Sequence, residues 1–492
     1  MGTLGNAMMT EASWTKTWNV ADALDTTFDK CLDLFGRAGA MREASVRDKQ
    51  SLFAEAFDEN PLVALRLLFY IRDVRGGYGE RDTFTDMLQW LANEKPELVN
   101  SNLWAILEYG RAKDLYSLIG TKAEDYMWKF IAAQFELDRR RMNSGESISL
   151  LAKWIATPDA SSKRTSALGK RTALAIGYDF RHMKEYKKIL REMRRYLDIP
   201  EAKMCAGKWS EIEYSKLASQ CLIKHRRAFA RHDEEGYSAF INKAKTGEVN
   251  MNTGAMTPCD IIRDVRMRYT NDLDVMWQNL ENYCKGNALV MCDTSGSMTW
   301  GSGSMLPIDV AVALSMYFAE RNEGDLKDLF MTFESIPHIV KIKGHDLKMK
   351  YDNILRADWG GSTNLEAAFM ELLRICKDNK VSAEEMPDAI VVVSDMQINE
   401  CSRDVNRENK LTFYADMKER YKDAGYTIPH LVFWNVNAVN PTFHTAKSDA
   451  GVSLVSGYSP AVFKAVMDNI GTTPLELMMS IVNSERYSSI VI

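Results

Sequence analysis

The sequence lacks several features that would place it quickly in a class of proteins. None of its eight cysteines forms a CxxC pair, so neither a zinc ribbon nor a secreted disulfide framework is expected. We expect the cysteines to be reduced thiols. No apolar run approaches the roughly 18 residues that a membrane span requires, and the start lacks the basic-then-apolar pattern of a signal peptide. The sequence therefore predicts a cytoplasmic protein with no membrane partner.

An excess of one charge is also missing from the chain as a whole. Lysine and arginine number 62 against 67 aspartate and glutamate residues, which leaves a formal net charge of −5 over 492 residues. Residues 139–231 are the exception, because they hold 22 basic and 9 acidic side chains, a net of +13. Any argument for a nucleic-acid partner must therefore be local and must start from this basic middle segment.

Hydrophobic periodicity divides the chain into two parts. Before residue 286, apolar residues recur at spacings of three and four, which is typical of amphipathic helices, and no convincing strand run is found. The predicted helices cover residues 61–75, 83–93, 101–109, 123–142, 147–156, 164–177, 182–197 and 211–230. Successive helices of this length with short polar connections favour a helical-repeat array.

From residue 286 onward, buried strand runs at 287–292, 326–333, 388–394 and 429–436 alternate with helical patterns at 304–322, 364–377, 406–424 and 459–469. This alternation predicts a doubly wound α/β domain with a parallel sheet. Three domains follow from it: a helical domain over 1–285, in which 232–285 is the connection, an α/β domain over 286–470, and a C-terminal helix and tail over 471–492. We expect the tail to pack back on the helical domain.

Polar side chains stand where two of the strand runs end. The string DTSGS (residues 293–297) follows the first run, Asp395 follows the run 388–394, and Thr363 precedes a helix. Because doubly wound sheets bind ligands at the carboxyl ends of their strands, these side chains are expected to converge. Oxygen donors around an open position suit Mg²⁺, Mn²⁺ or Ca²⁺. The predicted metal ligands are Asp293, Ser295, Ser297, Thr363 and Asp395. Taken alone, DTSGS also fits a polar turn that caps a helix.

Enzymatic uses of these residues find little support in the sequence. A nucleophilic serine requires a positioned base, and none of the seven histidines lies in these loops. A metal-dependent phosphoesterase is expected to carry a second carboxylate cluster, and none accompanies Asp293 and Asp395. We therefore expect a protein that is not an enzyme.

The DxSxS string, with a distant threonine and a distant aspartate, resembles the metal-ion-dependent adhesion site of von Willebrand A domains. The resemblance implies that Ser295, Ser297 and Thr363 contact the cation, and that Asp293 and Asp395 act largely through water. It also implies that a carboxylate from an acidic protein partner completes the coordination sphere.

The helical half carries a resemblance of its own. Residues 60–81, NPLVALRLLFYIRDVRGGYGER, are similar to the signature of the TROVE module of Ro ribonucleoproteins. The strings EYGRAKDL (108–115) and ISLLAKWIATP (148–158), residues 185–216 and the tail PLELMMSIVNSERY look closer to a branch of phage, giant-virus, plant and fungal proteins with the same layout. The resemblance implies a HEAT-like array, which can close into a ring, followed by a von Willebrand A-like domain. It also implies binding of structured or single-stranded RNA.

The predicted helix at 182–197 is a local reason to expect RNA, because cations recur along one face and apolar residues along another. The candidate RNA-binding residues are Arg181, Lys184, Lys188, Arg191, Arg195, Lys224, Arg226 and Arg227. Such a row can track phosphates without reading a DNA sequence, whereas a solvated face paired with acids of the same domain is the alternative. Tyr186, Trp209 and Tyr214 could stack on bases or be buried in the array.

Two functions remain open from the sequence. The first is a non-enzymatic RNA-binding scaffold of Ro type, with RNA on the basic array and an acidic protein partner recruited by the divalent metal. The second is a protein-interaction or assembly module of a viral or host-interaction kind, which uses the metal site without RNA.

Overall fold

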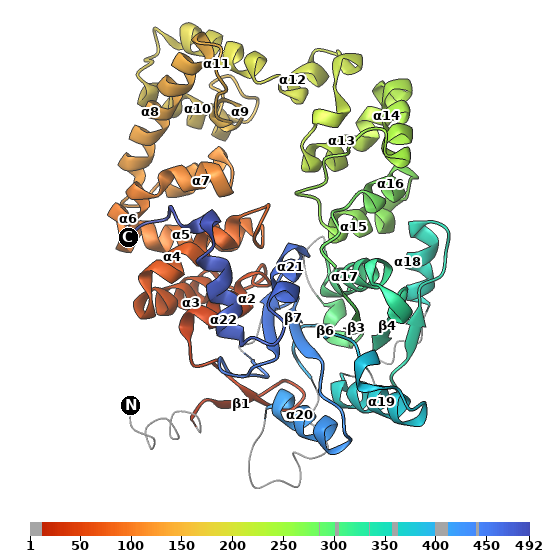
Figure 1. The fold of residues 1–492 in the computed structure, drawn as a ribbon. Helices are drawn as coiled ribbons and strands as arrows, with labels where there is room; N and C mark the ends of the chain where they lie inside the picture. The colour runs from red at the N-terminus through yellow and green to blue at the C-terminus, as the bar shows by residue number, and fades with distance from the viewer. Residues whose placement is uncertain are drawn as a thin grey trace.

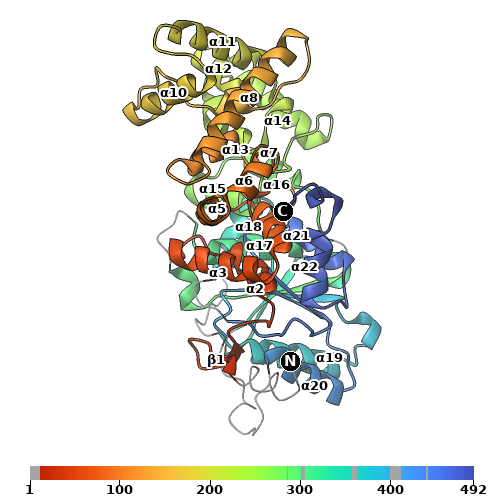
Figure 2. The ribbon, with the colours of Figure 1, turned by 90° about the vertical axis from the view of Figure 1, so that its left-hand side faces the viewer.

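The computed structural model shows a helical arch that stands on an α/β domain (Figure 1). The helices rise from the sheet along one limb, cross at α12 and descend along a second limb to the sheet again (Figures 1 and 2). The described residues are 12–284, 286–300, 305–333, 335–356, 363–398, 412–438 and 442–492.

The first limb begins with helices whose ends are marked in the sequence. Pro61 is the first residue of α4, and the Asn60 side chain caps the helix by accepting a hydrogen bond from the Val63 N–H at 3.2 Å. The elements of this limb are α2 (Lys30–Ala38), α3 (Val46–Glu59), α4 (Pro61–Arg72), α5 (Arg81–Glu94), α6 (Pro96–Ser101), α7 (Leu103–Tyr109), η1 (Ala112–Leu118), α8 (Glu124–Asn143), α9 (Leu151–Trp154), α10 (Lys163–Ile176) and α11 (Met183–Tyr196).

The second limb contains three helices in the segment that the sequence analysis assigned to a connection, residues 232–285, and that assignment was wrong. Pro258 begins α15, and Thr257 and Asp260 form a capping box in front of it. The elements are α12 (Pro200–Cys205), η2 (Trp209–Glu211), η3 (Tyr214–Lys216), α13 (Ser219–His232), α14 (Glu234–Thr246), α15 (Pro258–Arg268) and α16 (Asp272–Gln278).

The α/β domain is built on a six-stranded sheet in the order β5-β4-β3-β6-β7-β8. Its strands are β3 (Ala288–Cys292), β4 (Leu329–Thr332), β5 (Ile339–Lys341), β6 (Ala389–Ser394), β7 (His430–Asn435) and β8 (Val452–Ser456). All pairings are parallel except that of β5, which runs antiparallel to β4 at one edge. The order reverses beside β3, which is the switch point of a doubly wound sheet.

Alternate residues of the central strands pack against different helices. On one face, Val391 and Trp434 share a core with α17 (Pro307–Arg321) and with the helical domain. On the other, Val392 and Phe433 share a core with α19 (Leu365–Asp378) and α20 (Phe413–Asp423). Both faces are thus covered, as the near-continuous apolar runs of the strands require. The domain also contains α18 (Leu347–Leu355), α21 (Ala461–Asp468) and α22 (Pro474–Val482).

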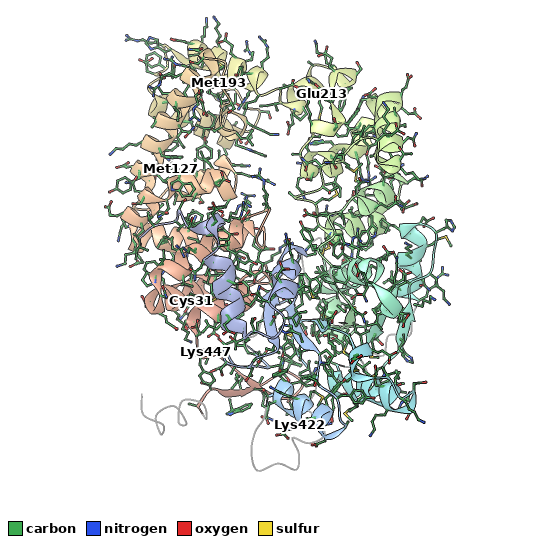
Figure 3. The ribbon with its side chains drawn as sticks, viewed as in Figure 1. Cys31, Met127, Met193, Glu213, Lys422 and Lys447 are labelled. Atoms are coloured by element: carbon green, nitrogen blue, oxygen red, sulfur yellow. The ribbon has the colours of Figure 1, made fainter. Side chains whose placement is uncertain are left out.

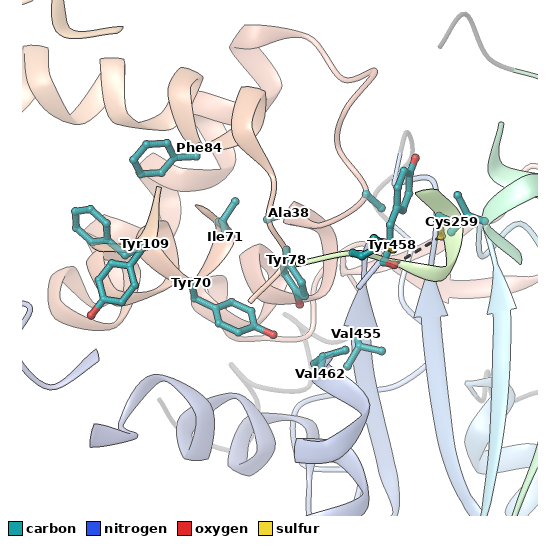
Figure 4. Close-up of a cluster of buried hydrophobic side chains, with 14 of the residues drawn as sticks. Ala38, Tyr70, Ile71, Tyr78, Phe84, Tyr109, Cys259, Val455, Tyr458 and Val462 are labelled. Carbon is teal, nitrogen blue, oxygen red and sulfur yellow. Dashed lines mark hydrogen bonds between the residues drawn. The ribbon is translucent and has the colours of Figure 1, made fainter. Parts of the chain in front are cut away.

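The arch meets the sheet through a continuous core (Figure 4). The Gly39 N–H donates to Ser456 Oγ at 3.0 Å, and a Cβ at residue 39 would lie 2.7 Å from the Ser456 carbonyl, so only glycine allows this approach. From the other limb, Cys259 Sγ donates to the carbonyl of Tyr458 at 3.7 Å. Both ends of the helical array are therefore fixed to the same edge strand and the loop after it.

The C-terminal tail lies against the beginning of the array. The Arg486 guanidinium and the Tyr487 hydroxyl both donate to the buried Asp73 carboxylate, each with a 2.8 Å contact. Asn102 exchanges two hydrogen bonds with the backbone of Val491. These contacts join the two ends of the chain across more than 380 residues.

The predicted fold class, a helical-repeat array followed by a doubly wound α/β domain, is confirmed. Several elements were not predicted: the hairpin β1 (Trp14–Lys16) and β2 (Asp22–Leu24), strands β5 and β8, and helices α2, α3 and α18. The beginnings of the predicted helices 304–322 and 406–424 lie outside the described residues. Within the described part of the chain, no helix combines the length and apolar character needed to cross a membrane.

Candidate functional site

Asp293 stands directly after β3 and is fully buried. Its N–H continues the β3–β6 ladder by donating to the Val393 carbonyl at 2.9 Å. Its two carboxylate oxygens accept hydrogen bonds from the Ser295 N–H at 2.9 Å and from the Ser394 hydroxyl at 2.5 Å. The turn therefore presents a carboxylate that is held from both strands and is shielded from water.

Asp395 follows β6, the strand beside β3, and is 5% exposed. Burial, and then the nearby charge of Asp395, raise the pKa of Asp293 to about 7, while hydrogen bonds from Ser394 and Ser295 oppose the rise. Burial also raises the pKa of Asp395, and a hydrogen bond from Ser297 opposes it. Within the described part of the chain, no lysine or arginine forms an ion pair with either carboxylate.

Two hydroxyl groups lie beside this acidic pair. Ser295 Oγ and Ser297 Oγ are 3.1 Å apart at the start of η4 (Gly296–Thr299), and Ser297 also contacts Asp395. Thr363 is 2% exposed and comes from the segment before α19. Residues 359–362, which precede it in the predicted loop, lie outside the described residues.

An unpredicted residue, Asn19, connects Thr363 to the segment that follows Asp395. Its Nδ2 donates to Thr363 Oγ1 at 3.4 Å and to the Gln397 carbonyl, two residues after Asp395, at 2.6 Å. Asn19 lies in the turn between β1 and β2, so the N-terminal hairpin holds two loops of the α/β domain together. Nothing in the local sequence signals this contact, because its partners are more than 340 residues away.

This cluster can offer a cation two carboxylates and the hydroxyl groups of Ser295 and Ser297, which is an all-oxygen donor set. In the described part of the chain no group of three or more His, Cys, Asp and Glu side chains is placed to hold a metal ion. A cation at this position would therefore depend on hydroxyl oxygens as well as carboxylates. That combination suits hard divalent ions better than zinc.

The predicted basic face follows α11, at the end of the arch opposite the sheet (Figure 1), and Arg181 lies in the turn just before this helix. Its five cations are all exposed, and within the described chain none of their side chains forms an ion pair. These residues are Arg181, Lys184, Lys188, Arg191 and Arg195. Two other cations of the helix are engaged elsewhere: Arg194 donates to the Ala152 and Ile155 carbonyls, and Lys187 pairs with Asp159 at 3.4 Å. The helix thus separates structural cations from free ones.

The candidates on α13 divide in the same way. Lys224 and Arg227 are exposed. Arg226 is 2% exposed and pairs with Asp264 at 3.0 Å and with Asp272 at 3.2 Å, so its assignment to an RNA-contacting face is corrected. It belongs to the core between α13 and α15.

The three aromatic candidates for base stacking do not present free ring faces. Tyr186 is fully buried, and Tyr214 is 7% exposed and donates to Asp233. Trp209 stacks on the ring of His232 with centroids 4.4 Å apart. All three contribute to packing within the array.

The structure thus defines a class of protein: a helical arch with a basic distal helix, closed on an α/β domain whose switch point carries buried acids and hydroxyls. A model described as a domain of unknown function (DUF2828) matches residues 17–134 and 127–288, and another domain of unknown function (DUF7788) matches residues 287–486. Because the first model covers more than half of the chain, the chain belongs to the DUF2828 family.

Two further similarities extend over nearly the whole chain. Uncharacterized protein L728 of Acanthamoeba polyphaga mimivirus is 26% identical over 508 residues, which cover 94% of this chain and 86% of that protein. This relative agrees with the giant-virus branch suggested by the sequence strings. The crystal structure of the Deinococcus radiodurans RO (RSR) protein matches with a TM-score of 0.48 and 14% identity over 93% of this chain and 99% of that one.

Proposed function

We propose that the chain is an RNA-binding scaffold of Ro type, in which the exposed face of α11 contacts RNA phosphates. The observation that carries the proposal is a row of five exposed cations, four on α11 and Arg181 just before it, without ion pairs in the described chain, beside two cations of α11 that do have partners. A face kept only for solubility has no need of such segregation. A row of cations of this kind can contact successive phosphates of a nucleic-acid backbone.

The second part of the proposal is a divalent cation, Mg²⁺ or a similar ion, at the Asp293–Asp395 cluster. Two buried carboxylates that repel each other are stabilised by a positive charge between them, and Ser295, Ser297 and Thr363 supply neutral oxygens. The cation would keep a position open for the carboxylate of an acidic protein partner. Neither step requires catalysis by the chain.

The test is binding of the purified chain to a fluorescent structured RNA with a single-stranded 3′ end, across a salt series with Mg²⁺ or EDTA. Affinity should fall steeply with salt, because each phosphate contact releases counterions, and should not change with EDTA. Absence of binding at low salt would refute the RNA part of the proposal. Binding that EDTA abolishes would place RNA at the metal cluster rather than on α11.

The competing function is a protein-interaction module. The buried acidic pair favours it, because a cation bound there could bind a carboxylate of a protein partner whether or not RNA is present. In that case the purified chain carries no nucleic acid and α11 meets an acidic protein surface. The ratio of absorbance at 260 and 280 nm of the purified chain separates the two at once.

A further inference from the structure

A cavity in the first limb is left unexplained by the proposed function. It has a volume of about 370 Å³, which is within the range of pockets for small ligands, and lies between α7, η1, α8 and the segment around α9. Two of the strings singled out in the sequence, EYGRAKDL and ISLLAKWIATP, supply most of its wall although they are about forty residues apart. In Figure 1, α7 and α9 are on the inner side of this limb and α8 is on its outer side.

The wall of the cavity is largely aromatic. Trp104 of α7, Phe130 of α8 and Trp154 of α9 line it, and Ile148 and Leu150 add aliphatic surface. Trp104 is 36% exposed and Leu150 is 56% exposed, so apolar surface that ordinarily prefers burial is open to solvent here. Flat, rigid rings on several sides favour a ligand that is itself planar and aromatic.

The polar part of the wall consists of Arg111, Glu108, Gln134 and Ser149, and Arg111 is its cation. Its guanidinium lies over the Trp154 ring, with Cζ 5.2 Å from the centroid, and forms no ion pair within the described chain. The other cation near this ring, Lys153, is neutralised by Glu201 at 3.1 Å. Arg111 is therefore the cation in the wall that is available to an incoming anion, and Glu108 is the acidic residue beside it in the lining.

The surroundings of Arg111 make the local charge positive. Asp114 is buried and pairs with Arg72 at 2.7 Å and with Arg81 at 3.4 Å, so one carboxylate already serves two arginines. Burial, and then repulsion by Arg72 and Arg81, lower the pKa of Arg111, against the attraction of Asp114. Three guanidinium groups, those of Arg72, Arg81 and Arg111, stand against two carboxylates, Asp114 and the cavity-lining Glu108, so one positive charge is left for an anionic ligand to neutralise.

The EYGRAKDL string explains how this arrangement is built. The Arg111 N–H donates to Asp114 Oδ2 at 3.1 Å, which ties the start of η1 to the buried carboxylate. A Cβ at Gly110 would lie 2.9 Å from the same oxygen and 3.0 Å from the Ile106 carbonyl, so glycine is required where the chain passes Asp114. The backbone is thus fixed, while the Arg111 side chain lies over the Trp154 ring at the edge of the cavity.

We propose that this cavity binds a nucleotide, with the base against Trp154 and Trp104 and the phosphate at Arg111. A planar aromatic group joined to an anion satisfies both the ring wall and the excess positive charge, which neither a purely apolar ligand nor inorganic phosphate does. The nucleotide can be a free mononucleotide or one unit of an RNA strand. In the second case the inference deepens the proposed RNA function and rests on it.

The first experiment uses the full-length chain and equilibrium dialysis with AMP, adenosine and inorganic phosphate. AMP is expected to bind more tightly than adenosine, and phosphate weakly or not at all. Arg111→Gln should weaken AMP about tenfold and leave adenosine within about twofold, because only the charge-assisted contact is lost. Trp154→Leu should weaken both ligands by at least about fivefold, because stacking is lost. Arg47→Gln, at an exposed arginine of α3, is the matched control and should change neither.

A second variant avoids any disturbance of packing. Leu150→Glu places a carboxylate at an exposed position of the cavity wall and should weaken AMP by electrostatic repulsion, whereas Leu174→Glu, at an equally exposed leucine on α10 (57%), should not. The same variants are then tested for binding of hexa-adenylate, which identifies the source of the nucleotide. If the native chain binds hexa-adenylate but not AMP, and the cavity variants lose hexa-adenylate binding, the inference is supported with RNA as the ligand.

The remaining outcomes separate the two proposals. If the chain binds AMP, the cavity variants weaken that binding and the chain does not bind RNA, the inference is supported and the proposed function fails. AMP and hexa-adenylate binding that is indifferent to Arg111→Gln, Trp154→Leu and Leu150→Glu overturns the inference, whether or not α11 binds RNA. If neither AMP nor hexa-adenylate binds the chain, the inference is overturned as well.

Discussion

Removal of three charges from α11 is the sharpest test of the proposed RNA surface. The variant Lys184→Gln, Lys188→Gln and Arg191→Gln keeps long polar side chains at exposed positions, so the helix and its buried face are preserved. If all five cations of the face neutralise phosphates of a single strand, the slope of log affinity against log salt is about −3.5, and the variant reduces it to about −1.4.

These slopes translate into a large difference in an ordinary assay. Between 50 and 200 mM salt, the native chain should lose about 100-fold in affinity for a fluorescent single-stranded RNA, and the variant only about sevenfold. Fluorescence anisotropy measures both, and at 50 mM salt the variant should already bind much more weakly. The magnitude follows from the number of cations exposed on one face, not from the net charge of the chain.

The control has to remove the same charge from another place. Lys377, Lys422 and Lys464 are exposed on helices of the α/β domain, and Lys422 lies at the opposite end of the molecule from Met193 of α11 (Figure 3). Their joint replacement by glutamine should leave the slope near its native value. An unchanged slope in the α11 variant, or an equal reduction in the control, would refute the assignment of RNA to this face.

Three further predictions concern the metal cluster and stability. Mn²⁺ at a hundredfold excess over Kd should raise the free energy of unfolding in urea by about 2.7 kcal/mol, and Asp293→Asn should abolish this stabilisation. The same variant should leave RNA affinity within about twofold of the native value. A parallel loss of RNA binding would contradict separate sites for the metal and the RNA. Arg226→Met should lower the free energy of unfolding by about 3 kcal/mol, because Asp264 and Asp272 lose their buried partner, whereas Arg227→Met, at its exposed neighbour, should change it by less than about 0.5 kcal/mol. Burial lowers the pKa of His430 to about 4. The free energy of unfolding that its neutral ring contributes is therefore complete above the unfolded-state pKa of about 6.5 and falls by about 3 kcal/mol as the pH drops towards 4. The variant His430→Asn still offers the Gly471 N–H an acceptor, and its free energy of unfolding in urea should fall less over that pH range.

The sheet and most of the array were predictable because their signals are local. Strands β3, β6 and β7 are runs of five or six buried residues, so each appears as an uninterrupted apolar segment. Strand β5 has only three residues, and its pattern at the sheet edge is exposed, buried, exposed, which is too short to read as alternation. The hairpin β1–β2 is missed for the same reason.

Within the candidate site, the limit is set by distance along the chain. That Asp293 and Asp395 are neighbours follows from topology, because adjacent parallel strands end at the same edge. The contact of Asn19 with Thr363 depends on how the N-terminal hairpin docks, which no local pattern encodes. The burial of Arg226, in contrast, had a signal, because it shares the three-and-four spacing of the buried Leu222 and Phe229.

The separation of the two proposed sites has a consequence for how such a scaffold would work. The α11 face lies at the distal end of the arch, and the acid–hydroxyl cluster lies in the α/β domain (Figures 1 and 3). Ligands at independent, distant sites bind with additive free energies unless one element with two arrangements connects them. In this fold both limbs are anchored on the α/β domain through Gly39–Ser456 and Cys259–Tyr458, and the tail is locked onto Asp73. An arch fixed at both ends favours a rigid bridge, so RNA and a protein partner would be brought together without either one altering the affinity of the other.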